Sequence, residues 1–380
     1  MPARLDAEWI EILNTTLPRY IREVSNETVR KRRSLDRLEK AGRLQFNCTG
    51  TEFTWPVKKA EIPATEYVTG TVTYTAHALH DQATVGRRGY IATDQIHKYD
   101  AKMNSGTEAL VNLWKNKAVE CANGIKNKIH TGIYQNGDGS DGFEGFGTWC
   151  AEAGTVANND RILQPVDTYG TLATTLGQGG STWSTDLSAS TVPIIPNAAL
   201  AYDWPFGQGD PEFDFWSPII ARYGGTSAAG WTGSADTWTT TCELVLSQVY
   251  QWLTIMRDFG GPPDSCVMSP EMLSGLKSAL RADRHYYVED TSDNADFGLG
   301  PTINYEGLKC WTEYGVPAGC GYIYRTEDID LLCLESELIT KEGPFFDENN
   351  MMYKFLATCP GNMRIKSPRR FAKLMSHASG

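Results

Sequence analysis

Long hydrophobic runs are missing from this sequence, and none approaches the roughly 18 apolar residues that a membrane-spanning helix requires. The first eleven residues also have no apolar signal-peptide core, because four charged side chains interrupt them: Arg4, Asp6, Glu8 and Glu11. We therefore expect the protein to stay in the cytoplasm in which it is made.

Paired cysteine spacings are missing as well. Nine cysteines are scattered from Cys48 to Cys359, and no Cys-x-x-Cys pair occurs among them. An odd, scattered set fits neither a disulfide framework nor a zinc site. We expect reduced cysteines that are mostly buried as small hydrophobic residues, and no disulfide.

The motifs of common active sites do not occur. The sequence has no G-x-S-x-G, H-E-x-x-H, G-x-x-x-x-G-K-[ST] or G-x-G-x-x-G motif, and its six histidines do not cluster. Residues 136–142 resemble the start of a calcium loop, but Asp141 stands where glycine is required and Gly147 where glutamate is required. We therefore predict no catalytic residue, no cofactor and no metal.

One group of carboxylates keeps an enzymatic alternative open. An acidic and aromatic segment near Trp204 and Trp216 contains Asp203, Asp210, Glu212 and Asp214. Two such carboxylates could act as the acid and base of a glycosidase. Acidic residues in loops rich in proline and glycine are more often solvated, so a carbohydrate-active enzyme is only an alternative here.

Basic charge is scarce overall, since the formal net charge is −11. This argues against a protein that reads DNA sequence, although not against one that encloses DNA. Hydrophobic residues make up 41% and charged residues 21% of the chain, which is typical of a folded protein.

The N-terminal 44 residues are predicted to be helical and polar. Trp9 and Leu13 belong to a short apolar stripe, and residues 19–43 contain nine basic against four acidic side chains. So few apolar residues cannot form an independent core, so this arm must lie on another surface. Its basic run at 30–33 either faces solvent or contacts nucleic acid or another subunit.

A hairpin is predicted at 51–77. Phe53, Trp55 and Val57 alternate with polar neighbours in the first strand, and Val68, Val72 and Tyr74 do so in the second. Residues 58–65 would form its charged tip. An isolated hairpin is marginally stable in water, so we expect its apolar face to pack on a neighbouring subunit.

The rest of the chain mixes helices with strands. A long helix is predicted at 107–131, a second at 235–258, and a third begins at Pro270 after its cap Ser269. Strands are predicted at 90–99, at 266–268 and after 305, ending in an antiparallel pair of 351–358 with 363–375. This pattern indicates an α+β fold.

The order of these elements resembles the major capsid proteins of tailed bacteriophages with the Hong Kong 97 fold. Local stretches carry the likeness too: residues 9–18, 35–42, 104–150 and 211–216. The similarity covers nearly the whole chain, and its motifs are diffuse because this family has no catalytic signature.

The resemblance implies a division of the chain into five segments. These are an N-terminal arm at 1–44, an extended loop at 45–82, a peripheral domain with the spine helix and inserted loops at 83–263, an axial domain at 264–345, and closing strands of the peripheral domain at 346–380. The long helix at 107–131 would be the spine helix.

The resemblance also implies a function. Copies of the chain would form the pentamers and hexamers of an icosahedral head around double-stranded DNA, assembled in the bacterial cytoplasm, with scaffolding, portal and cement proteins as further partners. Intersubunit contacts are expected at Trp9, Leu13, Arg32, Arg33, Phe53, Trp55, Val57, Lys58 and Lys59. The alternatives are an encapsulin-like compartment, a carbohydrate-active enzyme, and a DNA-binding module acting through the basic arm.

Overall fold

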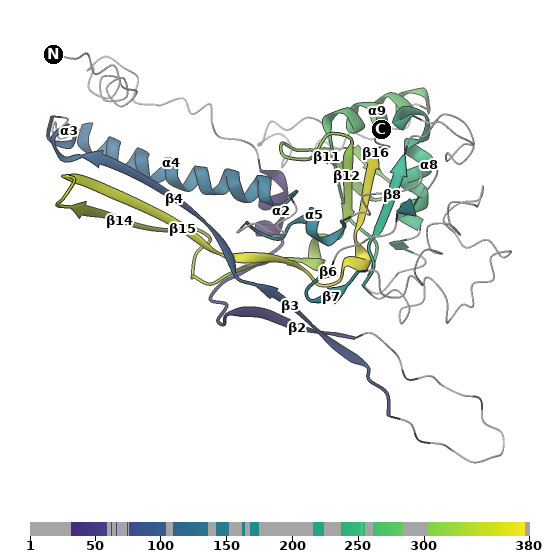
Figure 1. Ribbon diagram of the computed structural model, residues 1–380. Coiled ribbons are helices and arrows are strands. Elements are labelled where there is room, and N and C mark those ends of the chain that lie inside the picture. Colours follow the sequence, from purple (N-terminus) through teal and green to yellow (C-terminus); the bar gives the residue numbers. More distant parts are fainter. Residues whose placement is uncertain are drawn as a thin grey trace.

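The computed structural model describes residues 32–58, 62, 66, 74, 76–103, 109–135, 142–151, 162–163, 168–174, 216–223, 237–251, 253–254, 261–283 and 303–376. These residues form an elongated molecule built on two sheets, with a hairpin projecting from it (Figure 1).

A five-stranded sheet forms one end of the molecule. Its strands are β1 (Leu44–Gln45), β13 (Ile329–Cys333), β15 (Met352–Ile365), β14 (Thr340–Asp347) and β4 (Arg88–His97). The central strand β15 pairs antiparallel with β4 along one side, and with β14 and then β13 along the other.

Helix α4 (Ala109–Gly132) lies along one face of this sheet (Figure 1). Its buried residues recur at helical spacing, and an ion pair of 3.2 Å between Lys117 and Asp94 also joins it to β4. Strand β4 alternates accordingly: Ile96 is buried towards the helix, and Ile91 is exposed on the opposite face.

A seven-stranded sheet forms the other end. Its strand order is β10 (Ile303–Tyr305), β11 (Leu308–Thr312), β9 (Ser265–Met268), β12 (Cys320–Tyr324), β16 (Ala372–Ser376), β8 (Ile219–Tyr223) and β5 (Ile162–Leu163). Helices α8 (Trp238–Gln251) and α9 (Pro270–Asp283) pack on each other and on this sheet. The indole Nε1 of Trp238 donates to the carbonyl oxygen of Met272 at 2.6 Å, which fixes the two helices together.

An aromatic cluster joins the two sheets. The rings of Tyr134, in the turn that follows α4, and of Phe146, in α5 (Phe146–Trp149), lie 5.3 Å apart, and the ring of Phe146 lies 5.1 Å from that of Phe371. All three side chains are fully buried in one continuous core.

The remaining elements are α2 (Arg33–Lys40), β2 (Glu52–Lys58), β3 (His80–Gly86), α3 (Lys98–Met103), β6 (Thr168–Tyr169), β7 (Leu172–Ala173), η2 (Thr326–Asp328) and η3 (Pro368–Arg370).

The α+β class and the three long helices are confirmed. The predicted pairing of 351–358 with 363–375 is wrong, because β15 is one continuous strand and β16 belongs to the other sheet. Gly361 permits this continuity: a Cβ there would collide with the carbonyl oxygen of Leu332 on the neighbouring strand.

The five predicted segments of the chain do not each contribute strands to a single sheet. The segment 264–345 supplies β9 to β12 to the seven-stranded sheet, but β13 and β14 to the five-stranded sheet. Strands β8 and β16 join the seven-stranded sheet from outside that segment. The assignment of segments to positions in a shell stays a prediction.

Candidate intersubunit surface

The stem of the projecting hairpin consists of β2 and β3. They pair antiparallel, with Trp55 opposite Ala83 and Phe53 opposite Val85. The partner of the first predicted strand is therefore residues 80–86, and the expected pairing with the strand around 68–74 is wrong. Of that strand, Val68 and Val72 lie outside the described residues.

The apolar face of the stem packs inside its own subunit. Phe53, Trp55 and Val57 are only 7%, 8% and 9% exposed. Trp55 contacts the rings of Tyr169 and Trp216, with centroids 6.1 Å and 6.4 Å away. The expectation that these three residues face a neighbouring subunit is therefore wrong, because all three side chains are buried within their own subunit. The rings that cover Trp55 lie more than a hundred residues further along the chain.

A hydrogen bond and a cation–π contact also fix the side chain of Trp55 in this buried position. Its indole Nε1 donates to the carbonyl oxygen of Lys366 at 3.2 Å, and the guanidinium of Arg364 lies 5.3 Å from its ring centre. Arg364 in turn donates to the fully buried carboxylate of Asp330 at 3.0 Å. Strand β15 and the residue that follows it therefore fix the hairpin stem by one hydrogen bond and one cation–π contact.

A tight turn between β6 and β7 supports the second strand. The backbone N–H of Thr84 donates to the carbonyl oxygen of Gly170 at 2.9 Å. Gly170 has a φ of +61°, and a Cβ there would lie 3.1 Å from the Cβ of Ala83. Glycine therefore allows both the turn and the close approach of the hairpin.

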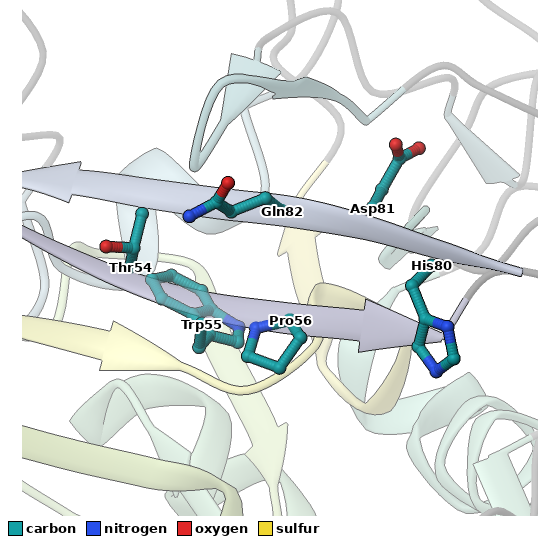
Figure 2. Close-up of a pocket in the computed structure, with 6 residues that line it drawn as sticks. All are labelled: Thr54, Trp55, Pro56, His80, Asp81 and Gln82. Atoms are coloured by element: carbon teal, nitrogen blue, oxygen red, sulfur yellow. The ribbon is translucent and has the colours of Figure 1, made fainter. Parts of the chain in front are cut away.

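The opposite face of the stem is polar and open. A shallow hollow of about 470 Å³ lies along the stem, and Figure 2 shows its lining residues: Thr54, Trp55, Pro56, His80, Asp81 and Gln82. The residues lie along two neighbouring strands and do not converge on one point. This hollow is the side of a strand pair, and its side chains do not form an acid–base or nucleophile arrangement.

Beyond the stem, the described apolar residues are uncovered. Ile62 is 67% exposed and Tyr74 is 93% exposed. Lys58, at the end of β2, is also exposed, and Lys59 lies outside the described residues. The exposed apolar surface of the hairpin is therefore in its distal part and not in its stem.

The N-terminal helix α2 lies on its own subunit. Arg32 donates to Asn127 Oδ1 of α4 at 2.8 Å, and the guanidinium groups of Arg33 and Arg37 lie 5.3 Å and 4.7 Å from the ring centre of Trp311. The basic run thus contributes two residues to intrasubunit contacts, so the predicted role of Arg32 and Arg33 between subunits finds no support here. Trp9 and Leu13 lie outside the described residues.

A buried polar network anchors the start of α2. The backbone N–H of Ser34 donates to Glu313 Oε1 at 3.0 Å, and the hydroxyl of Tyr134 donates to Glu313 Oε2 at 2.5 Å. His130 Nδ1 lies 3.4 Å from Glu313 Oε1. Burial and the nearby carboxylate raise the pKa of Tyr134 well above its usual value. One carboxylate therefore ties α2, the end of α4 and the seven-stranded sheet together.

Chemistry-bearing groups do not assemble elsewhere in the described part of the chain. Among those residues, no group of three or more His, Cys, Asp or Glu side chains could hold a metal ion. No described helix is long and apolar enough to cross a membrane. The glycosidase candidates Asp203, Asp210, Glu212 and Asp214 lie outside the described residues.

The cysteines are free thiols, and seven of the nine are buried. The expectation that most are buried is confirmed. Burial raises the pKa of the Cys242 thiol to about 11, so it is protonated and unreactive at neutral pH.

The sequence alone did not indicate the residues that contact the hairpin stem or support those contacts, namely Tyr169, Trp216, Asp330, Arg364 and Lys366. The aromatic segment ending at Trp216 was the one available signal, since a large ring in a loop often marks a buried contact. Nothing local marked Asp330 or Arg364, because their partners come together only in the folded sheet.

Comparisons with known proteins give structural matches but no sequence matches. No family model matches the sequence, and no curated protein does. The capsid asymmetric unit of cyanophage A-1(L) aligns at a TM-score of 0.58 and 14% identity, covering 94% of this chain and 96% of that one. The capsid of a native GTA particle aligns at a TM-score of 0.53 and 13% identity, covering 95% of this chain and 94% of that one.

An encapsulin complex from Synechococcus elongatus also aligns, at a TM-score of 0.47 and 8% identity, over 93% of this chain and 92% of that one. The two higher-scoring matches extend over nearly the full length of both chains. The protein therefore has the capsid fold known as the Hong Kong 97 fold, and the fold expected from the resemblance is confirmed.

Proposed function

We propose that this chain is a self-assembling shell protein. The observation that carries the proposal is the capsid fold, which extends over nearly the whole chain and leaves no additional described domain for another activity. The exposed distal part of the hairpin supports it, since Ile62 and Tyr74 gain burial only on another surface.

More specifically, we propose the major capsid protein of a tailed double-stranded DNA bacteriophage. Copies would assemble in the host cytoplasm into pentamers and hexamers of an icosahedral head, and the protein would reside in the virion. The role is structural, with no catalytic residue and no cofactor. Scaffolding, portal and cement proteins are further proposed partners, and the packaged DNA is enclosed without sequence recognition.

Assembly would draw its free energy from many small contacts. Burial of apolar surface contributes about 25 cal/mol per Å², from which the entropy of association is subtracted. Two side chains such as Ile62 and Tyr74 cannot hold a pair of subunits together alone. In a closed shell every subunit makes such contacts with several neighbours at once, so weak contacts sum to a stable particle.

The test is the assembly state of the expressed protein. Sedimentation velocity and negative-stain microscopy should show pentamers, hexamers or closed shells, with or without co-expressed scaffolding protein. A monodisperse monomer of 42.1 kDa under all of these conditions would overturn the proposal.

The contents of particles made in their native context separate a phage head from a compartment. Nuclease-protected double-stranded DNA is expected inside. A protein cargo without DNA would assign the chain to the encapsulin-like alternative.

A further inference from the structure

Two segments of the chain are attached to the five-stranded sheet by charged side chains. The first runs from α2 into β1 and is called the arm segment here, and the second is the stem of the β2–β3 hairpin. Both attachments meet at one carboxylate, that of Asp330 in β13. Asp330 is fully buried, so protein side chains and not water compensate its charge.

The hairpin stem is connected to Asp330 through Arg364. The two residues are paired in register on β13 and β15, and Arg364 donates to Asp330 Oδ2 from Nε at 3.2 Å and from Nη2 at 3.0 Å. The same guanidinium lies 5.3 Å from the ring centre of Trp55 in β2. Because the carboxylate fixes the guanidinium, it also fixes the cation that the ring of Trp55 contacts.

The arm segment is connected to the other oxygen of Asp330 through Arg43. Nη1 of Arg43 lies 3.8 Å from Asp330 Oδ1. The backbone N–H of Arg43 donates to the carbonyl oxygen of Leu38 at 2.9 Å, and its own carbonyl oxygen accepts from the N–H of Leu331 at 3.0 Å. Arg43 is therefore the residue at which the chain passes from α2 to the side of β13.

We propose that Asp330 is a positioning residue that fixes the arm segment and the hairpin stem jointly, so that the two are energetically coupled. The arm and the hairpin are the parts of the chain that we expect to contact neighbouring copies, and in this respect the inference rests on the proposed function. Asp330 would set the geometry of both before assembly begins.

The physical basis is the charge balance at this site. The guanidinium groups of Arg43 and Arg364 carry like charges, and the anion between them allows them to lie close together. If a neutral amide replaces the anion, repulsion drives both groups towards solvent. Arg364 then leaves the ring of Trp55, and Arg43 leaves β13. Loss of one guanidinium alone is milder, because the buried carboxylate keeps the other.

A second buried carboxylate close by provides a matched control. Asp328 is also buried, and its Oδ1 accepts from Arg370 Nη1 at 2.8 Å. This pair joins η2 to η3, and Arg370 belongs neither to the arm segment nor to the hairpin. Asp328→Asn therefore makes the same change of charge at similar burial.

The first experiment is backbone hydrogen exchange on the full chain. Asp330→Asn should accelerate exchange about tenfold both in residues 33–45 and in the stem, 52–58 with 80–86, since hydrogen bonds to charged groups are among the stronger ones. Asp328→Asn should leave both regions at wild-type rates. Acceleration in only one region, or an equal effect of the two variants, would overturn the inference.

The second experiment retains Asp330 and so remains decisive if Asp330→Asn does not fold. Arg43→Gln and Arg364→Gln are compared singly and together by thermal melting. The double variant should lose more in Tm than the two single losses added, because only then is the buried carboxylate left without a cation. Arg43→Gln combined with Arg370→Gln should be additive. Additive losses for Arg43 and Arg364 would overturn the coupling.

Sedimentation then measures the consequence for assembly. Asp330→Asn should lower shell yield about tenfold relative to Asp328→Asn, since a misplaced arm and hairpin affect every contact between copies. Wild-type shell yield from Asp330→Asn would overturn its role in assembly while the proposed function stands. Absence of rings and shells from the wild type would overturn the proposed function, whereas the exchange and melting measurements would still decide the coupling.

Discussion

At the scale of single residues, Trp55 determines how the hairpin is held. Its side chain contacts the Arg364 guanidinium and the rings of Tyr169 and Trp216, and its indole N–H donates a hydrogen bond to the carbonyl oxygen of Lys366. The alternation of Phe53, Trp55 and Val57 correctly predicts a strand with one apolar face. The identity of the covering surface could not be predicted, because it comes from residues that are distant in the sequence.

We predict that Trp55→Ala destabilises the free subunit by about 3 to 5 kcal/mol, since it removes a large buried side chain from a core. Thermal or denaturant unfolding of the unassembled chain measures this loss. Thr54→Ala, one position away on the exposed face of the same strand, should change stability by less than about 0.5 kcal/mol. If the Trp55→Ala subunit were as stable as the wild type, the hairpin stem would not be packed on the core of its own subunit.

At the scale of elements, α2 is attached by charges as much as by apolar contacts. Leu35 and Leu38 are its buried apolar residues, and Ser34 binds the buried Glu313. Burial, with the nearby carboxylates of Glu39 and Glu313, raises the pKa of Asp36, although Arg32 and Lys126 oppose the shift. The ionised form of Asp36 is therefore less favourable in the folded subunit than in the unfolded chain.

The sign of the pH dependence follows from this raised pKa. The neutral acid is favoured in the fold, so the contribution of Asp36 to stability is fully present below its unfolded pKa of about 3.9 and declines as pH rises through the folded value. We predict that Asp36→Asn raises the melting temperature at pH 7 and that the difference from wild type disappears near pH 3. Measurements of Tm against pH test this.

The control is Glu342→Gln, which makes the corresponding change from carboxylate to amide at an exposed position on β14. A lower Tm for Asp36→Asn at pH 7 would mean that Arg32 and Lys126 outweigh the burial of the carboxylate.

The helices and strands differ in how well their positions can be predicted from the local sequence. Helices α4, α8 and α9 follow from apolar residues at intervals of three and four, which is a local signal. Strand β3 is weakly marked, because only Ala83 and Val85 are apolar within it, and the stronger alternation at 68–74 led to the wrong partner. The continuity of β15 depends on the close approach of Gly361 to the carbonyl oxygen of Leu332 on the neighbouring strand, and no local sequence pattern reveals this contact.

At the scale of the whole molecule, two groups of exposed apolar residues lie far from the core. Ile62 and Tyr74 lie between β2 and β3, and Tyr99, Phe345 and Phe346 lie near the free end of the β14–β15 hairpin. The full-length capsid fold was recognisable from the order of the elements. The proximity of the three rings near the β14–β15 hairpin was not, because Tyr99 and residues 345–346 are about 245 residues apart in the sequence.

We predict that Tyr74→Ser leaves the free subunit as stable as the wild type and lowers the yield of rings and shells. The ring is almost fully exposed, so its removal costs the isolated fold little, whereas a neighbouring copy would lose a contact. Paired measurements of Tm and of sedimentation test this, with Glu66→Gln on the same loop as the control. A large fall in Tm, or unchanged assembly, would contradict the prediction.

The continuous strand β15 has a mechanical consequence. Its 14 residues extend over about 46 Å, from Met352 at the free end of the β14–β15 hairpin to Ile365, and Arg364 contacts Trp55 in the stem of the β2–β3 hairpin. Hydrogen bonds to β4 on one side and to β14 and β13 on the other stiffen it along its length. The free end of the β14–β15 hairpin and the stem of the β2–β3 hairpin are therefore coupled through a single hydrogen-bonded strand.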